Sequence, residues 1–308
     1  MNVLTCTDSR FVIPTGVMLY SVCKNNPEEE LNFYLIVDKT VTEIQKQALS
    51  SEISKFTNTS IHFFKIDVED IKQYLIVVAP KFPISIYYRL LIADILPHNV
   101  DKILYLDGDI IVRHSLENLW KTDISNYSLG AVVNQTNGQR FWERLHYPKE
   151  KGYFNSGVLL INVKYWRDNT ISTKLIDYLK NNPDVLVNPD QDVLNFVLQD
   201  SKLLLPERYN MQEFFYRTER EKVECESTTD IESSLSDPYI LHYTGTKPWS
   251  YNCLHPLKNI YYIYKIQTQW TKDKSMEHIE RNKYVDFLKF KIKQLLNYHI
   301  VNYQSIIV

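Results

Sequence analysis

Glycine and cysteine are both scarce in this chain. Its 308 residues include only 7 glycines and 4 cysteines. Cys6, Cys23, Cys225 and Cys253 are scattered, and none of them forms the Cys-x-x-Cys spacing of a zinc site. The cysteines therefore predict neither a structural zinc site nor a disulfide framework. Their pattern is typical of a protein in a reducing compartment.

The chain also lacks a long apolar run, a basic leader and a strong net charge. No stretch reaches the roughly eighteen apolar residues of a membrane-spanning helix. The opening residues (MNVLTCTD) show no basic segment followed by an apolar one, so no signal peptide is predicted. The formal net charge of −2 gives no support for a nucleic-acid partner. We therefore expect a globular, cytoplasmic protein.

The most informative stretch is 102–112 (KILYLDGDIIV), where two acids stand one residue apart inside an apolar run. The run predicts a buried strand that continues across the acids. Buried carboxylates at Asp107 and Asp109 are costly unless a divalent cation accepts oxygen from both. Gly108 would let the backbone bend so that the two acids converge. Asp-Gly is also the favoured dipeptide of a hairpin turn, so a plain hairpin is the alternative at this point.

The N-terminal third alternates between two kinds of hydrophobic pattern. Strands are predicted at 3–7, 31–37 and 60–66, with helices at 17–25 and 42–56 between them. In the second helix the apolar residues, Ile44 among them, follow helical spacing. This order is typical of a mostly parallel sheet with helices on its faces.

Ligands of such sheets bind beyond the carboxyl ends of the strands. Thr7 and Asp8 stand at the end of the first predicted strand, and Asp107 and Asp109 stand in the fourth. We expect these side chains to share one crevice, which favours the metal site over the hairpin.

The middle of the chain continues the alternation less regularly. It predicts helices at 84–96 and 164–182, a buried strand at 158–163, an irregular loop at 135–152 and a polar surface segment at 218–237. A short helical segment at 67–75 and a loop at 80–83 complete this region.

Two acids flank Gln191 just before a predicted helix at 193–199. Acids at a helix start are favourable for its dipole, by about 0.3–1 kcal/mol each. Simple helix capping is therefore one interpretation of Asp190 and Asp192, and a role in a site is the other.

A second informative stretch is 239–249 (YILHYTGTKPW). It reads as a strand that ends at His242, and a turn with a chance histidine would explain it without chemistry. Two carboxylates and an imidazole with open positions suit Mn²⁺ better than Ca²⁺ or structural Zn²⁺. The open positions would take pyrophosphate oxygens, and Lys247 and the backbone at Gly245 could neutralise the same phosphates.

The last part of the chain is aromatic and basic. From Arg281 onward lysines and arginines outnumber acids, and several apolar residues fall on one side of a helical wheel. Such a segment fits a peripheral contact with an anionic membrane. A C-terminal helix packed on the domain is the alternative.

Six motifs, in order over about residues 1–250, carry a resemblance to a known family. They are Thr7-Asp8, 88–90 (YRL), 102–112, 154–162 (FNSGVLLIN), 190–192 (DQD) and 242–249 (HYTGTKPW). The chain resembles glycosyltransferase family 8, the retaining GT-A group that includes bacterial lipooligosaccharide galactosyltransferases and glycogenin.

The resemblance implies an α/β fold of the GT-A nucleotide-diphospho-sugar transferase type, with a mixed, mostly parallel sheet flanked by helices. It implies a catalytic domain at 1–250 and a helical extension at 251–308. Mn²⁺, with Mg²⁺ as a substitute, is the implied cofactor. The implied donor is UDP-galactose or UDP-glucose, and the implied acceptor is a glycan or glycolipid at the inner face of the cytoplasmic membrane.

The resemblance also implies a role for each motif residue. Thr7 and Asp8 would hold uracil and ribose, and Gly245 and Lys247 would grip the diphosphate. The metal would be held by Asp107, Asp109 and His242, with Asp107 also near the sugar. The donor hexose would be oriented by Arg89, Asn155 and Asp190. Gln191 would lie by the anomeric carbon.

An amide is a poor nucleophile, whereas a covalent retaining mechanism needs a carboxylate. We therefore favour a front-face mechanism in which Gln191 stabilises charge. Arg10 departs from the family pattern at a position that concerns the nucleotide contact. Asn134 replaces an acid on the acceptor side and the 135–152 loop differs, so we expect a different acceptor. A binding protein with little turnover and a UDP-sugar hydrolase are the competing functions.

Overall fold

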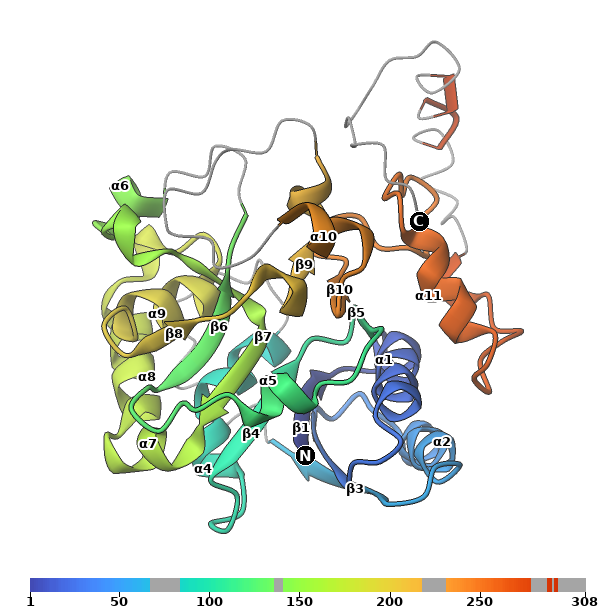
Figure 1. Ribbon diagram of the computed structural model, residues 1–308, viewed down its shortest axis with the longest axis horizontal. Coiled ribbons are helices and arrows are strands. Elements are labelled where there is room, and N and C mark those ends of the chain that lie inside the picture. The colour runs from blue at the N-terminus through green and yellow to red at the C-terminus, as the bar shows by residue number, and fades with distance from the viewer. Residues whose placement is uncertain (67–83, 136–140, 218–230, 278–286, 290, 293–308) are drawn as a thin grey trace.

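The computed structural model describes residues 1–66, 84–135, 141–217, 231–277, 287–289 and 291–292. Its centre is a seven-stranded sheet with the strand order β3-β2-β1-β4-β7-β6-β8 (Figure 1). The strands are β1 (Asn2–Thr7), β2 (Leu31–Val37), β3 (Thr59–Lys65), β4 (Lys102–Leu106), β6 (Leu129–Val133), β7 (Phe154–Asn162) and β8 (Lys202–Leu204).

The sheet is mixed and mostly parallel, as predicted. Strand β1 runs parallel to both β2 and β4, and β2–β3 and β6–β8 are parallel pairs as well. Only β7 runs against its neighbours, β4 and β6, in this part of the sheet. The carboxyl ends of β1 and β4 therefore meet at one edge, while the amino end of β7 reaches the same edge.

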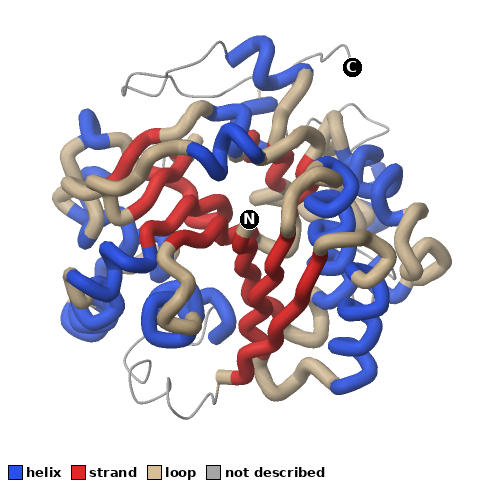
Figure 2. Tube along the Cα trace, turned by 60° about the horizontal axis from the view of Figure 1, so that its bottom comes forward, coloured by secondary structure: helices blue, strands red, loops and turns tan. Residues whose placement is uncertain are grey.

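Helices cover both faces of the sheet (Figure 2). Successive residues of β4 alternate between two cores: Ile103 and Tyr105 pack in one, and Leu104 and Leu106 pack in the other. This accounts for the nearly unbroken apolar run in the sequence.

The helices are short and numerous. The α-helices are α1 (Val12–Asn25), α2 (Glu43–Ile53), α4 (Ile92–Ile95), α5 (Glu117–Lys121), α6 (Phe141–Leu145), α7 (Val163–Asp168), α8 (Ile171–Asn181), α9 (Pro189–Val197), α10 (Ile231–Ser236) and α11 (Lys258–Lys265). The 3₁₀ helices are η1 (Ile84–Leu91), η2 (Lys149–Lys151), η3 (Pro183–Val185), η4 (Glu207–Tyr209), η5 (Glu213–Tyr216) and η6 (Ser275–Glu277).

A second, three-stranded sheet corrects the prediction for 102–112. The segment β5 (Ile110–Val112) does not continue β4; it pairs with β10 (Ile240–His242), which also pairs with β9 (Met211–Gln212). The plain hairpin is wrong as well, since β4 and β5 lie in different sheets. The chain crosses between the sheets at Gly108, where a side-chain Cβ would lie 2.8 Å from Oγ1 of Thr15.

The first two helices differ from prediction, α1 in the residue at which it begins and α2 in the exposure of one apolar residue. Helix α1 begins at Val12 and not at residue 17, because Pro14 lies in the first turn, where its missing N–H needs no partner. Helix α2 begins with a capping box between Thr42 and Gln45. Ile44, expected in the apolar stripe, is 78% exposed.

The predicted helix at 164–182 is two helices. Helices α7 and α8 are separated at Thr170, whose φ of 51° is left-handed and ends a continuous helix. The predicted helix at 84–96 is η1 followed by the single turn α4. Helix α9 begins at Pro189, so residues 190–192 lie inside its first turn and not before it.

The segment at 135–152 was predicted to be irregular, yet its described part contains α6 and η2. The sequence shows no helical spacing of apolar residues here because each helix is too short to contain a repeat. Phe141 stacks on Tyr153 with ring centroids 4.2 Å apart, and Leu145 and Tyr147 join the same cluster. In the 218–237 segment the described part forms α10, with Leu235 buried.

The first part of the C-terminal extension packs on the domain. Tyr261 of α11 joins a buried cluster with Val17 of α1, and Asn25 donates to the Tyr264 hydroxyl at 2.9 Å. The backbone N–H of Gln269 donates to Glu52 at 2.9 Å. The boundary at residue 250 stays a prediction.

Three sequence predictions concern residues beyond this description. The helix at 67–75 and the loop at 80–83 lie outside the described residues, as does most of the basic segment from Arg281 onward. Among the residues that are described, no helix combines the length and the hydropathy needed to cross a bilayer.

Candidate active site and metal centre

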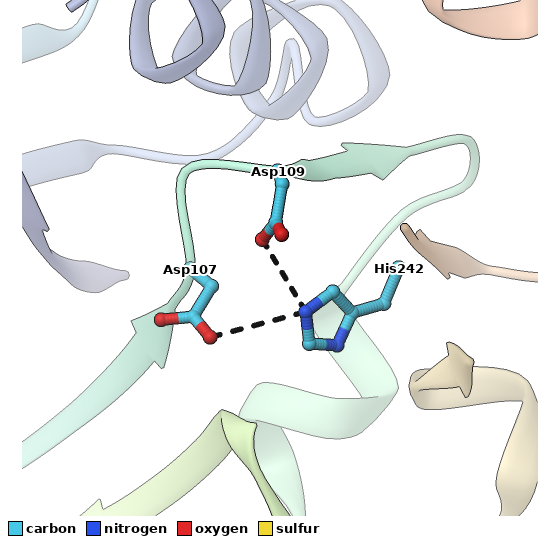
Figure 3. A group of neighbouring side chains, drawn as sticks. All are labelled: Asp107, Asp109 and His242. Carbon is cyan, nitrogen blue, oxygen red and sulfur yellow. Dashed lines mark ion pairs between the residues drawn. The ribbon is translucent and has the colours of Figure 1, made fainter. Parts of the chain in front are cut away.

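Three predicted ligands converge where the two sheets meet (Figure 3). Asp107 follows β4, Asp109 precedes β5 and His242 ends β10. Nε2 of His242 lies 3.3 Å from Oδ1 of Asp109 and 3.8 Å from Oδ2 of Asp107. One ligand atom from each residue lies within 4.8 Å of the other two. Each could therefore contact one cation at their centre.

Backbone pairing fixes this arrangement. His242 is opposite Ile110 in the β10–β5 ladder, and the N–H of Tyr243 donates to the carbonyl of Asp109 at 3.1 Å. The imidazole packs against Gly157 of β7, where a Cβ would overlap the ring and lie 2.7 Å from Oδ2 of Asp107. The close approach of the ring to the strand therefore needs glycine at 157.

Asp109 is a buried carboxylate kept ionised by its neighbours. Burial raises its pKa, but the Lys247 ammonium and the His242 ring outweigh burial and hold the pKa well below its usual range. Lys247 is ion-paired with Asp109 and donates to the carbonyl of Tyr243 at 2.7 Å. Two carboxylate groups and an imidazole form a donor set of hard oxygens and a borderline nitrogen that fits a divalent cation.

Arg89 links the metal ligands to the acid of the 190–192 motif. Its Nη2 donates to Oδ1 of Asp107 at 2.9 Å, and its Nε lies 3.3 Å from Oδ2 of Asp190. The Tyr105 hydroxyl also donates to Oδ1 of Asp107, at 2.6 Å. Burial raises the pKa of Asp190, and the Arg89 charge opposes that rise. Asp190 is therefore not a plain helix cap.

Gln191 and Asn155 face each other beside this pair. Oε1 of Gln191 accepts from Nδ2 of Asn155 and from the backbone N–H of Ser156, each at 3.1 Å. The Ser156 hydroxyl donates to Asp190 at 3.0 Å. The predicted donor-sugar residues thus form one connected polar group, all within a single cavity.

Asp192, in contrast, has a structural role. It is fully buried and its carboxylate accepts hydrogen bonds from Arg144 and from the Tyr153 hydroxyl, at 2.6–2.9 Å. It also accepts from the backbone N–H groups of Val187 and Asn188, at 2.7 and 2.9 Å. Asp192 thus binds backbone N–H groups at the start of α9, as the capping interpretation expects. These N–H groups belong to the residues just before the helix and not to its first turn.

Two adjoining cavities hold nearly all the predicted site residues. One of about 400 Å³ is lined by eight of them: Arg89, Asp107, Asp109, Asn155, Asp190, Gln191, His242 and Lys247. A second, of about 200 Å³, is lined by Thr7 and Asp8. Arg89, Asp107 and Asp109 line both, so the two cavities adjoin at the metal ligands.

The carboxylate of Asp8 is held in place by its own turn. It accepts from the N–H groups of Arg10 and Phe11, at 2.8 and 3.2 Å, and from the Arg10 guanidinium at 2.7 Å. Thr7 accepts from the Thr15 hydroxyl at 3.0 Å. The end of β1 therefore faces the smaller cavity in a fixed conformation.

Gly245 lines neither cavity, but it passes tightly over a residue that the sequence did not reveal. A Cβ at 245 would overlap the carboxylate of Glu213. That buried carboxylate accepts from the N–H of Thr246 at 3.0 Å and is ion-paired with Arg217. Glu213 holds the loop that carries Lys247. No local pattern marks this role, because Thr246, the loop residue that it holds, is distant in sequence.

Comparison with known proteins agrees with this geometry. The sequence profile of glycosyl transferase family 8 matches residues 2–253. The chain is 31% identical to a lipopolysaccharide 1,2-glucosyltransferase of Escherichia coli, over 93% of this chain and 85% of that protein. It is 28% identical to general stress protein A of Bacillus subtilis, over 88% of this chain and 94% of that protein.

A solved structure shows the same fold. The galactosyltransferase LgtC, crystallised with donor and acceptor sugar analogues, superposes with a TM-score of 0.75 at 23% identity. The match covers 92% of this chain and 99% of that one. The profile match over most of the sequence, together with the Asp-x-Asp metal-binding site, shows that the chain belongs to glycosyltransferase family 8 and has the GT-A fold.

Proposed function

We propose that this chain is a retaining, Mn²⁺-dependent hexosyltransferase. It moves galactose or glucose from a UDP-sugar to a hydroxyl of a cell-surface glycan or lipid-linked saccharide. The observation that carries the proposal is the convergence of Asp107, Asp109 and His242 at the junction of two cavities. A sugar nucleotide has the same order: a nucleoside, a charged diphosphate and a neutral sugar.

The nucleoside and the hexose lie on opposite sides of the metal ligands. Uracil and ribose lie in the smaller cavity against Thr7 and Asp8. The diphosphate lies at the metal ligands, with Lys247 and the backbone at Gly245 adding positive potential. The hexose lies in the larger cavity, where Arg89, Asn155 and Asp190 present charged and amide groups to its hydroxyls.

Asp107, Asp109 and His242 would hold Mn²⁺, and Mg²⁺ could replace it. When bound, the cation supplies Lewis-acid stabilisation of the charge that develops on the departing diphosphate. Lys247 shares that task from its position beside Asp109.

The reaction proceeds by a front-face mechanism. Oε1 of Gln191 already accepts two hydrogen bonds and belongs to an amide, so it is unsuited to bond formation. Asp190 is engaged by Arg89 and by the Ser156 hydroxyl. Gln191 and Asp190 therefore stabilise an oxocarbenium-like transition state. The acceptor hydroxyl attacks from the face that the diphosphate leaves and gives its proton to an oxygen of the departing diphosphate.

The acceptor binds in the larger cavity beside the hexose. Asn134, Phe214 and Thr244 also line this cavity, and they offer one aromatic face and two polar groups. We propose that the protein works at the inner face of the cytoplasmic membrane, with the extension from residue 251 in peripheral contact. Exposed Leu288 and Ile292 support this, since each is about half accessible, at 47% and 55%.

Release of UDP tests the proposal. The protein is incubated with UDP-galactose or UDP-glucose, with Mn²⁺, with Mg²⁺ and without metal. We expect metal-dependent release that rises when acceptor glycans are added. Release that does not respond to any acceptor favours the hydrolase. Binding of UDP-sugar without release favours the accessory protein and contradicts the proposal.

A further inference from the structure

Asn210 is a fully buried residue between η4 and β9, and no motif drew attention to it. Its side chain lies between the metal ligand His242 and the donor-sugar residue Asn155. Its Oδ1 is 2.9 Å from Nδ1 of His242, and its Nδ2 is 3.0 Å from Oδ1 of Asn155. It is therefore a direct link between the two halves of the site.

Two backbone N–H groups determine the direction of every hydrogen bond in this link. The N–H of Gly157 donates to Oδ1 of Asn155 at 3.0 Å, and that of Ser156 donates to Oε1 of Gln191 at 3.1 Å. A backbone N–H can only donate, so both of these side-chain atoms are acceptors. The orientation of each amide is fixed by this requirement.

The remaining assignments follow in order. Because Oδ1 of Asn155 is an acceptor, the atom of Asn210 that faces it must be the donor Nδ2. Oδ1 of Asn210 then faces His242 and can only accept, so Nδ1 of His242 carries a hydrogen. Of the two neutral tautomers of the ring, only the one with its lone pair on Nε2 satisfies Asn210.

In that tautomer the lone pair faces the carboxylates of Asp107 and Asp109, at 3.8 and 3.3 Å, so that a cation, or a second proton when no cation is bound, lies between them. A neutral ring with its N–H on Nε2 would point a hydrogen at the position of a cation and could not bind one there. The hydrogen-bond partner of the second ring nitrogen orients a metal-binding histidine and raises its basicity.

We propose that Asn210 is a positioning residue that selects the metal-binding tautomer of His242 and, through Asn155, couples it to the donor-sugar group. The inference rests on the proposed cation site. The hydrogen that Asn210 requires on Nδ1 of His242 is a property of the protein without any ligand, so it can be tested separately from turnover.

The first test is ¹⁵N NMR of histidine-labelled protein, free of metal and donor. His242 is assigned by comparison with His242→Gln. We expect a hydrogen on Nδ1, donated to Asn210. A ring with no hydrogen on Nδ1 overturns the proposal, whereas failure of UDP release would contradict the proposed transferase and leave this result intact.

The second test compares two buried asparagines. Asn210→Leu removes both hydrogen bonds, and we expect its Mn²⁺ affinity, measured by electron paramagnetic resonance, to fall at least about tenfold. Asn26→Leu is the control. Asn26 is 2% exposed and also makes two hydrogen bonds, to Val22 and Leu116, away from the site. Equal Mn²⁺ affinities in the two variants overturn the proposal.

Asn210→Asp separates the contact with His242 from the contact with Asn155. It also replaces the leucine variant as the test if that variant fails to fold. The carboxylate still accepts from Nδ1 of His242 but cannot donate to Asn155. We expect the Nδ1 hydrogen to remain and Mn²⁺ affinity to stay within about threefold of the wild type. The KM for the donor should rise, since Asn155 loses its partner. Loss of the Nδ1 hydrogen in this variant overturns the proposal.

Discussion

Arg89 and Asp107 are joined by a hydrogen-bonded ion pair of 2.9 Å between Nη2 and Oδ1. The same guanidinium contacts Asp190 through Nε and donates to the carbonyl of Ser156 through Nη1. Arg89 is only 5% exposed and therefore sets the distance between Asp107 and Asp190. The planar fork of arginine suits this bridge, whereas a lysine ammonium would reach only one side.

Arg89→Lys should lower kcat by roughly 100-fold, because a small misplacement of reacting groups has an effect of that size. Initial rates of UDP release at saturating donor measure it. Arg113→Lys is the control, since Arg113 pairs with Asp237, a half-exposed acid outside both cavities. A rate for Arg89→Lys within twofold of the control would contradict the bridging role.

Asp109→Asn should reduce metal-dependent release by more than about 100-fold, because it removes a charged ligand and not merely a partner of one. Calorimetric titration with Mn²⁺ should show a matching loss of affinity. Asp101→Asn alters an exposed carboxylate and should leave both unchanged. Normal Mn²⁺-dependent rates in Asp109→Asn would refute the metal assignment.

Gly157→Ala should weaken Mn²⁺ binding by at least about tenfold, since the added methyl group must displace the His242 ring. Gly130→Ala is a matched control in the neighbouring strand β6. There the new Cβ meets only the side chain of Leu205, at 3.2 Å, and Leu205 can shift slightly. Unchanged Mn²⁺ affinity in Gly157→Ala would mean that the ring does not need its observed position.

Asp190 should form no covalent adduct with the donor sugar. A fluorinated UDP-hexose slows the reaction, and intact-protein mass spectrometry detects any glycosyl-enzyme. We expect unmodified protein, together with retained anomeric configuration in the product of the normal donor, read by NMR. An adduct on Asp190 would contradict the front-face mechanism and indicate a double displacement.

His255 should make the fold sensitive to acid. Burial lowers the pKa of its ring to about 3, from an unfolded value near 6.5. Between these two pH values the unfolded chain binds a proton that the folded chain does not. Its contribution to stability is therefore complete above pH 6.5 and falls by roughly 1.4 kcal/mol for each pH unit below it.

His255→Asn should flatten that slope. An asparagine at this position can still accept from the N–H of Leu257, as Nδ1 of His255 does at 3.0 Å. The free energy of unfolding, measured with urea from about pH 4.5 to pH 7, gives the slope. His98→Asn, at an exposed position, should leave the slope unchanged. Equal slopes in all three proteins would place the acid sensitivity elsewhere.

Much of the site follows from local sequence patterns. Asp107 and Asp109 were predictable because two acids inside an apolar run need a partner that the run cannot supply. The capping box of Thr42 and Gln45 and the two-sided burial of β4 depend on neighbours a few residues away. The family motifs extended this to Arg89, Asn155 and His242, which the structure brings together in one cavity.

Two of the errors have separate physical causes. The sequence predicted one continuous strand at 102–112. Instead, β5 leaves the main sheet because its hydrogen-bonding partner is β10, far along the chain. The break at Thr170 arises from a left-handed backbone that the hydrophobic period does not register.

The sequence by itself determined the kind of chemistry, since acids, an imidazole and a lysine at these positions suit a cation and a diphosphate. It also determined the alternation that builds a covered sheet. Only the tertiary structure decided how the groups are held: Asn210 against His242, Glu213 under Gly245, and Lys247 beside Asp109. These contacts join residues brought together by strand pairing within the three-stranded sheet. The direction of the hydrogen bonds can be assigned only when that pairing is known.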